Sequence, residues 1–148
     1  MKFSTSFFYS ILFLGLLALG TAAQVEDAPK EIQAFVDREA KKEEVPVEIN
    51  KLIYGNVGGD KKQDIVIQYN VQVGYPGNSF LSYIAVFLNR NGKYVFTAKM
   101  ENGAKLSIVL VPAGVKNRVI SFDKYGENGF KKIGTARYRL AGRKLVKV

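Results

Sequence analysis

The residue types that carry most enzymatic chemistry are scarce in this 148-residue chain, which contains no histidine and no cysteine. Without them the chain offers no imidazole base, no thiolate nucleophile, no disulfide and no usual zinc site. Hydrolysis by paired carboxylates needs two acids close together in a cleft, and no spacing among the acids after residue 63 singles out such a pair. We therefore predict a protein that is not an enzyme and carries no cofactor, with a small hydrolase as the remaining alternative.

The stretch GNVGGDKKQD at residues 55–64, followed by apolar residues 65–67, is a candidate metal loop. It resembles the pattern G-D-x-N-G-D-G-x-x-D of FG-GAP and VCBS-type repeats, whose loop carboxylates bind calcium. Asn56 replaces the first acid of that pattern and Lys61 replaces a glycine, so only Asp60 and Asp64 match its acidic positions. Because calcium takes about six to eight oxygen ligands, we expect no metal here. We expect instead a tight turn in which both carboxylates accept backbone hydrogen bonds.

The segments SYIAVFLNRNGKYVF and RYRLAGRKLVKV, taken with that stretch, are similar to part of a known group of proteins. The chain resembles small exported bacterial proteins of unassigned function that carry one degenerate FG-GAP/VCBS-like segment. The resemblance implies export and an antiparallel sheet, and it carries over no catalytic residues.

The first 23 residues have the order of a secretory signal peptide: a basic start, an apolar run at 7–19 and small residues at 20–23. The apolar run is shorter than the ~20 residues that span a bilayer. We predict cleavage near Ala23, which leaves residues 24–148 as one exported domain, periplasmic or extracellular. That domain meets the membrane only through the signal peptide, before cleavage.

Positive charge is concentrated in the second half of the chain. The net charge is +9, but residues 24–60 carry nine acids and five bases, whereas residues 61–148 carry sixteen bases and four acids. A basic surface of this kind suits an acidic partner, and it also occurs on soluble proteins of high isoelectric point.

The basic C-terminal stretch contains the candidate anion-binding residues. A two-residue loop at 142–143 would place Leu140 opposite Leu145, which matches apolar side chains across a hairpin. Arginine and lysine then gather on the other face, and arginine binds phosphate, sulfate and carboxylate with two hydrogen bonds. Basic edge strands also protect sheets from aggregation, so a solvated edge is the alternative. The candidate residues are Lys131, Arg137, Arg139 and Lys144.

An N-terminal helix and a series of strands must position these residues. Apolar residues at helical spacing predict an amphipathic helix at 28–44, capped by Asp27. Alternation and turn residues predict strands at 48–54, 64–73, 80–89, 94–99, 106–111 and 118–122, before the last hairpin. The strand at 64–73 is expected to be half-buried, with Gln68 and Asn70 on its polar face. Asn91-Gly92 predicts a hairpin that places Phe87 opposite Phe96.

The predicted fold class is α+β, with one N-terminal amphipathic helix packed on a mostly antiparallel meander sheet of about six or seven strands. The strands at 80–89 and 106–111 are apolar on both faces, so one helix cannot cover the sheet. We expect the sheet to curl into a sandwich or barrel, or to bury a face against a partner such as a second copy of the chain.

The function predicted from the sequence is non-catalytic binding outside the cytoplasm. The first hypothesis is an adaptor or inhibitor of another exported protein, and the second is binding of an acidic polymer by the basic face. Export argues against nucleic acid as the partner. Polar loops that carry a tyrosine often make contacts in binding proteins. The candidate contact residues are Tyr75, Asn78, Tyr125 and Asn128.

Overall fold

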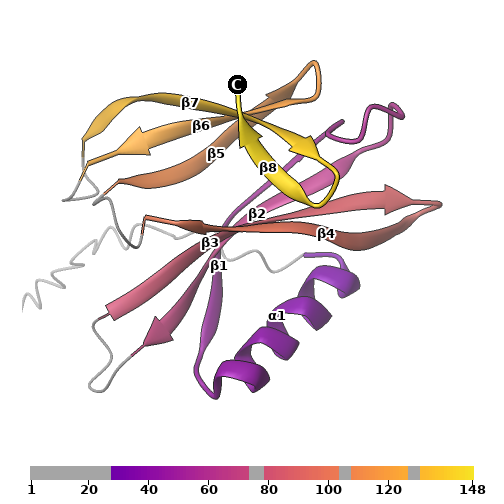
Figure 1. Ribbon diagram of the computed structural model, residues 1–148. Helices are drawn as coiled ribbons and strands as arrows, with labels where there is room; N and C mark the ends of the chain where they lie inside the picture. Colours follow the sequence, from indigo (N-terminus) through magenta and orange to yellow (C-terminus); the bar gives the residue numbers. More distant parts are fainter. Residues whose placement is uncertain (1–27, 74–78, 104–107, 127–130) are drawn as a thin grey trace, which may run out of the picture.

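The computed structural model describes residues 28–73, 79–103, 108–126 and 131–148. That part of the chain holds one helix and eight strands (Figure 1). The predicted signal peptide lies outside the described residues. Within them, no helix has the length and apolar character needed to cross a membrane. In chain order the elements are α1 (Lys30–Glu43), β1 (Val47–Gly55), β2 (Asp64–Val73), β3 (Ser79–Arg90), β4 (Lys93–Asn102), β5 (Val109–Lys116), β6 (Val119–Tyr125), β7 (Lys132–Ala141) and β8 (Lys144–Lys147).

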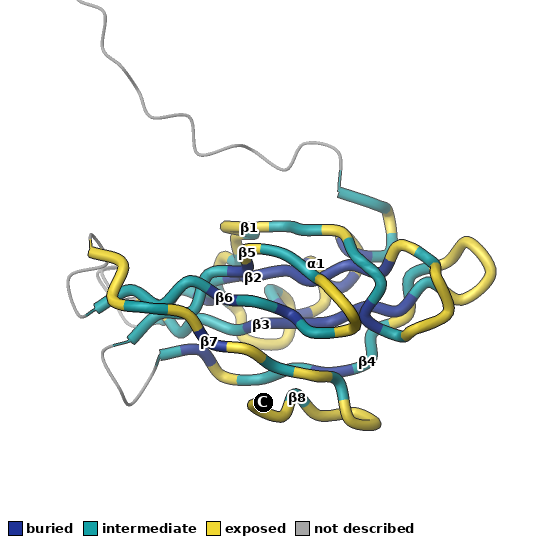
Figure 2. Tube along the Cα trace, turned by 90° about the horizontal axis from the view of Figure 1, so that it is seen from above, coloured by how far each residue is buried: buried dark blue, intermediate teal, exposed yellow. Residues whose placement is uncertain are grey.

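The described strands form two antiparallel sheets, in the orders β1-β2-β3-β4 and β5-β6-β7-β8. Helix α1 covers one face of the first sheet, and the second sheet packs on the opposite face (Figure 1). Buried residues concentrate along β2 and β3, the central strands of the first sheet (Figure 2). The architecture is therefore α+β and mostly antiparallel, as predicted. The prediction of one sheet with six or seven strands was wrong, because eight described strands divide between two sheets.

The second sheet is needed because β2 and β3 are apolar on both faces. Ile65 and Ile67 of β2 face the helix, whereas Val66 faces the second sheet. Residues 64–69 are consequently all buried, so the prediction that this strand is half-buried was wrong. Gln68 and Asn70, expected on a polar outer face, instead lie on the face that meets the second sheet.

Helix α1 packs through the predicted apolar stripe. Ile32, Phe35 and Val36 are buried against the first sheet. The Phe35 ring lies 5.5 Å from the Tyr69 ring and 5.1 Å from the Phe87 ring, both edge-on. Edge-on aromatic pairs add about 0.5–1.5 kcal/mol beyond their buried area. The sheet therefore supplies the stability that so polar a helix lacks on its own.

The helix boundaries differ slightly from the prediction. The expected cap, Asp27, lies outside the described residues, and Pro29 stands at the N-cap without a side-chain hydrogen bond. At the other end Glu44 adopts a left-handed conformation, with φ of 56°, and donates its backbone N–H to Ala40. This turn ends the helix just before Pro46.

Two-residue turns connect several strands. Residues 91–92 both have positive φ, 55° and 83°, as a type I′ hairpin requires. The register places Phe87 opposite Phe96, which confirms the prediction. The predicted strand 118–122 begins one residue later, because Arg118 lies in the β5–β6 turn with φ of 63°. The predicted strand 106–111 corresponds to β5, and residues 106–107 lie outside the described part.

Candidate anion-binding site

The two candidate arginines lie on the outer face of the second sheet. The hairpin loop at 142–143 begins with Gly142 at φ of 59°, the sign that a type II′ turn needs. It sets Leu140 opposite Leu145, as predicted, and both leucines pack toward the core between the sheets. Because side chains alternate along a strand, Arg137 and Arg139 point away from that core and are exposed.

Cross-strand pairing brings a third cation to the same face. Lys116 of β5 pairs with Val119 of β6, which pairs with Arg139 of β7. In the neighbouring row, Ser121 pairs with Arg137. These rows surround a cavity of about 430 Å³. Its lining residues are Lys116, Asn117, Val119, Ser121, Arg137, Arg139 and Val148.

No acidic side chain of the described residues pairs with the cations at this cavity. The structure contains four ion pairs among the described residues, and none of them includes Lys116, Arg137 or Arg139. In the described part of this sheet the outer face holds one acidic side chain, Asp123, and its Oδ1 lies 2.7 Å from the Nζ of Lys132. Val148 also lines the cavity, and its terminal carboxylate takes part in none of these ion pairs. The three cations therefore have no ion-pair partner among the described residues, and the Ser121 hydroxyl and Asn117 amide provide neutral hydrogen-bonding groups beside them.

The other two candidate bases lie outside this cavity. Lys144 begins β8 opposite Ala141, on the same face as the two arginines, and extends the basic surface along the hairpin. Lys131 precedes β7. A bulge at Ile133 shifts the register there, so that Lys132 rather than Lys131 reaches the outer face at Asp123. The structure thus brings Arg137 and Arg139 together, with Lys144 nearby and Lys131 apart.

Sequence reasoning missed Lys116. The signal that could have found it is the pair Asn117-Arg118, which forms a two-residue turn with φ of 51° and 63°. Recognising that turn fixes Lys116 opposite Val119 and therefore places it in the row that contains Arg139. Arginine is a rare choice for a left-handed turn position, which is why the pattern is hard to see.

The calcium-like stretch forms a structural turn. Asp64 is buried, and its Oδ2 accepts the backbone N–H groups of Val57 and Gly58 at 2.8 and 2.7 Å. Its Oδ1 accepts the N–H of Asn89 at 2.8 Å. Asp60 accepts the N–H of Lys62 at 3.1 Å, so the expected backbone hydrogen bonds are confirmed for both acids. Within the described residues, no cluster of three or more His, Cys, Asp or Glu could hold a metal.

The predicted contact loops are mostly beyond the described residues. Tyr75, Asn78 and Asn128 fall in the ranges 74–78 and 127–130, which the structure does not describe. Tyr125 is the last residue of β6 and is half-buried.

No protein-family model, curated protein or solved structure matches this chain. The function must therefore be argued from the geometry.

Proposed function

We propose that this protein is an exported, non-catalytic binding module that holds an acidic polymer on the outer face of the β5–β8 sheet. The observation that carries the proposal is the convergence of Lys116, Arg137 and Arg139 on one cavity, where none of them forms an ion pair with another described residue. Sulfate, phosphate or carboxylate groups would supply the missing negative charge, and the arginine forks would bind them with two hydrogen bonds each.

The arrangement of the cations favours a polymer over a single small anion. Arg137 and Arg139 are two residues apart on one strand, or roughly 6–7 Å. Lys116 lies two strands away from Arg139, roughly 10 Å across the sheet. Lys144 continues the surface along the last hairpin. Charges spread at these intervals suit a chain that presents one acidic group after another.

The test is binding to heparin, a sulfated polysaccharide, measured by titration calorimetry over a range of salt concentrations. The full chain is expressed and the protein purified. Binding to a dense polyanion releases counterions, so the logarithm of the affinity should fall linearly with the logarithm of the salt concentration. In Arg137→Gln/Arg139→Gln the magnitude of this slope should decrease by about 2, since two cations are removed.

The matched control removes the same charge from the other side of the molecule. Lys30→Gln/Lys41→Gln changes two exposed lysines of α1, which covers the opposite face of the first sheet. This variant should keep a slope close to that of the unchanged protein. Equal losses in both variants would mean that net charge alone attracts heparin, and the proposed face would be wrong. A partner protein that stays bound at high salt and tolerates the arginine substitutions would support the adaptor hypothesis instead.

A further inference from the structure

A row of polar side chains crosses the first sheet on the face that meets the second sheet. Asn70 of β2 pairs with Ser82 of β3, which pairs with Asn102 of β4. Gln68, two residues before Asn70, lies on the same face. Gln68 and Asn102 are 6% and 2% exposed. Polar groups taken out of water are costly unless they are hydrogen-bonded, so the partners of this row identify its role.

Asn102 has a structural role. Its Nδ2 donates to the carbonyl of Leu110 at 2.8 Å, and its Oδ1 accepts the Leu110 N–H at the same distance. These two bonds fix the beginning of β5 in the second sheet against the end of β4 in the first. The second Nδ2 hydrogen bond goes to the Oγ of Ser82 at 3.1 Å.

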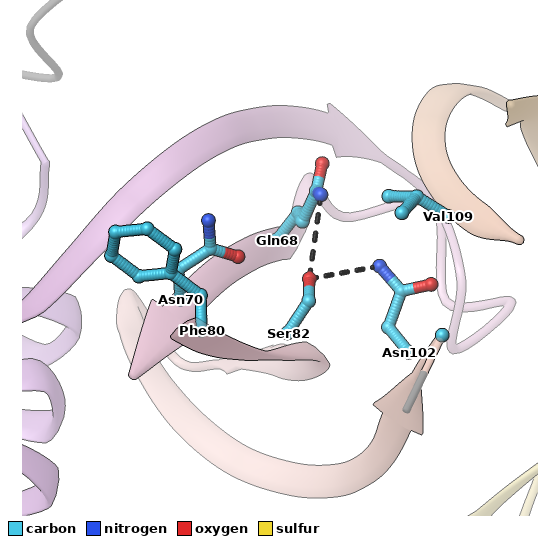
Figure 3. Close-up of a pocket in the computed structure, with 7 residues that line it drawn as sticks. Gln68, Asn70, Phe80, Ser82, Asn102 and Val109 are labelled. Carbon is cyan, nitrogen blue, oxygen red and sulfur yellow. Dashed lines mark hydrogen bonds between the residues drawn. The ribbon is translucent and has the colours of Figure 1, made fainter. Parts of the chain in front are cut away.

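Ser82 and Asn70 keep hydrogen-bonding capacity. The Oγ of Ser82 accepts from Asn102 at 3.1 Å and from the Nε2 of Gln68 at 3.4 Å (Figure 3). A hydroxyl that accepts two hydrogen bonds still has its own hydrogen to donate. Beside it, the Oδ1 of Asn70 is buried and has no hydrogen-bond partner among the described residues. One unused donor and one unused acceptor thus lie next to each other.

These groups line a cavity of about 200 Å³ between the sheets. One water molecule needs about 10–15 Å³, so this cavity can hold a molecule the size of a single ring. Among the described residues, its lining contains no charged side chain. Phe80, which is 54% exposed, lies on one side of the cavity, and Val109 of the second sheet lies on the other (Figure 3). The full lining is Gln68, Asn70, Phe80, Ser82, Asn102, Gly103 and Val109.

We propose that this cavity binds one neutral sugar ring. A sugar hydroxyl can donate to the Oδ1 of Asn70 and accept from the hydroxyl of Ser82 at the same time. The ring's C–H face can pack on Phe80, as apolar parts of ligands do in pockets of mixed character. A charged ligand would lose its hydration without gaining a counter-charge, so the lining selects for a neutral one. This site is separate from the anion-binding face and does not depend on the proposed function.

The test uses the side-chain amide signals of the cavity residues in nitrogen–proton NMR spectra of the ¹⁵N-labelled protein, purified after expression of the full chain. Glucose, galactose, mannose and N-acetylglucosamine are titrated separately at millimolar concentration, followed by neutral oligosaccharides of any sugar that binds. We expect at least one sugar to shift the Asn70 and Asn102 amide signals in a saturable manner. If the oligosaccharide binds more tightly than the monosaccharide, the ligand is the end of a glycan chain. If the two bind equally, the ligand is the free sugar. No shift with any of the four sugars, or a shift with inorganic phosphate instead, would overturn the proposal.

Substitutions of cavity residues test whether the sugar binds in this cavity. Ser82→Ala removes the free donor and should weaken the affinity about fivefold, as expected for one neutral hydrogen bond. Phe80→Ala changes an exposed side chain, so it should fold normally and still weaken binding several-fold. The control, Thr97→Ala, removes a hydroxyl that bonds to the Val95 carbonyl on β4 outside the cavity, and it should bind as before. Unchanged affinity in Phe80→Ala would overturn the proposal even if Ser82→Ala failed to fold.

Discussion

Asp64 shows how one buried carboxylate can organise a loop through backbone hydrogen bonds. Its two oxygens accept three backbone N–H groups, from Val57, Gly58 and Asn89. We expect Asp64→Asn to lower the free energy of unfolding by about 2–4 kcal/mol, because an amide NH₂ then faces backbone donors that lose their acceptor. Urea denaturation measures the loss.

Asp60 is the matched control for this substitution, since it belongs to the same loop but is exposed and accepts a single backbone N–H, from Lys62. Asp60→Asn should cost less than about 1 kcal/mol. Similar losses for the two variants would contradict the central role of Asp64. A calcium-dependent rise in melting temperature that either substitution abolishes would contradict the structural turn altogether.

The sequence was sufficient to predict that Asp60 and Asp64 hold a turn, because short-range hydrogen bonds from Asx side chains follow from local spacing. It was not sufficient to predict the bond from Asn89, which is 25 residues farther along the chain. That contact depends on the pairing of β2 with β3. The same limit applies to Gln68 and Asn70, which were expected on a polar outer face but lie on the face that the second sheet covers.

At the level of elements, an ion pair supplements the apolar contact between α1 and the first sheet. The Nζ of Lys99 on β4 lies 2.7 Å from the Oε2 of Glu39, a side chain 11% exposed, and the Tyr69 hydroxyl donates to the same oxygen at 3.3 Å. Burial alone would raise the pKa of Glu39, but the hydrogen bond and charge of Lys99 outweigh it and lower that pKa below its usual 4.5. Burial and the nearby carboxylate raise the pKa of Tyr69, which keeps its hydroxyl a donor.

Lys99→Met should reverse the pH dependence that Glu39 contributes to stability. In the unchanged protein folding lowers the pKa of Glu39. The stability that ionised Glu39 contributes is therefore complete above pH 4.5 and is lost as the pH falls through the pKa of Glu39 in the folded protein. Burial is the largest single influence on the pKa of Glu39, so without Lys99 we expect it to outweigh the Tyr69 hydrogen bond and the Lys42 charge and to raise that pKa above 4.5. The variant should then be about 2 kcal/mol less stable at neutral pH and should regain stability as the pH falls.

The measurement is the free energy of unfolding in urea at a series of pH values. Glu39→Gln/Lys99→Met serves as the control, because it removes the titrating group and should lose this part of the pH dependence in either direction. If the stability of Lys99→Met changes with pH in parallel with that of the unchanged protein, Lys99 does not affect the pKa of Glu39. The ion pair would then have no part in holding the helix on the sheet.

The hairpins could be predicted from the residues in their turns, whereas the division of the strands into two sheets could not be predicted. The pairs Phe87–Phe96 and Leu140–Leu145 follow from two-residue loops whose sequences require positive φ. The change of sheet after β4 has no comparable local signal. It depends on which apolar faces meet, and the sandwich was one of several ways to cover a strand that is apolar on both sides.

At the scale of the molecule, the two sheets share one apolar layer, although among the described strands none of one sheet pairs with a strand of the other. Val66, Ile84 and Val86 of the first sheet pack with Ile120 and Phe122 of the second. Each sheet therefore provides the cover that the other needs. The basic face remains on the outside of this layer, where it does not disturb the packing.

This shared layer predicts that the protein unfolds as a single unit. Phe122 is fully buried in the layer, and Phe122→Ala should lower the free energy of unfolding by about 3–5 kcal/mol. The loss should appear as one transition, with the same midpoint by circular dichroism, which follows α1, and by tyrosine fluorescence. Phe80→Ala, which changes an exposed side chain, should change the free energy of unfolding by less than about 0.5 kcal/mol. If the circular dichroism signal of α1 survives in this variant while the tyrosine fluorescence signal is lost, the first sheet and α1 are stable without the second sheet. The face of β2 and β3 that the second sheet covers would then have to be buried in another way.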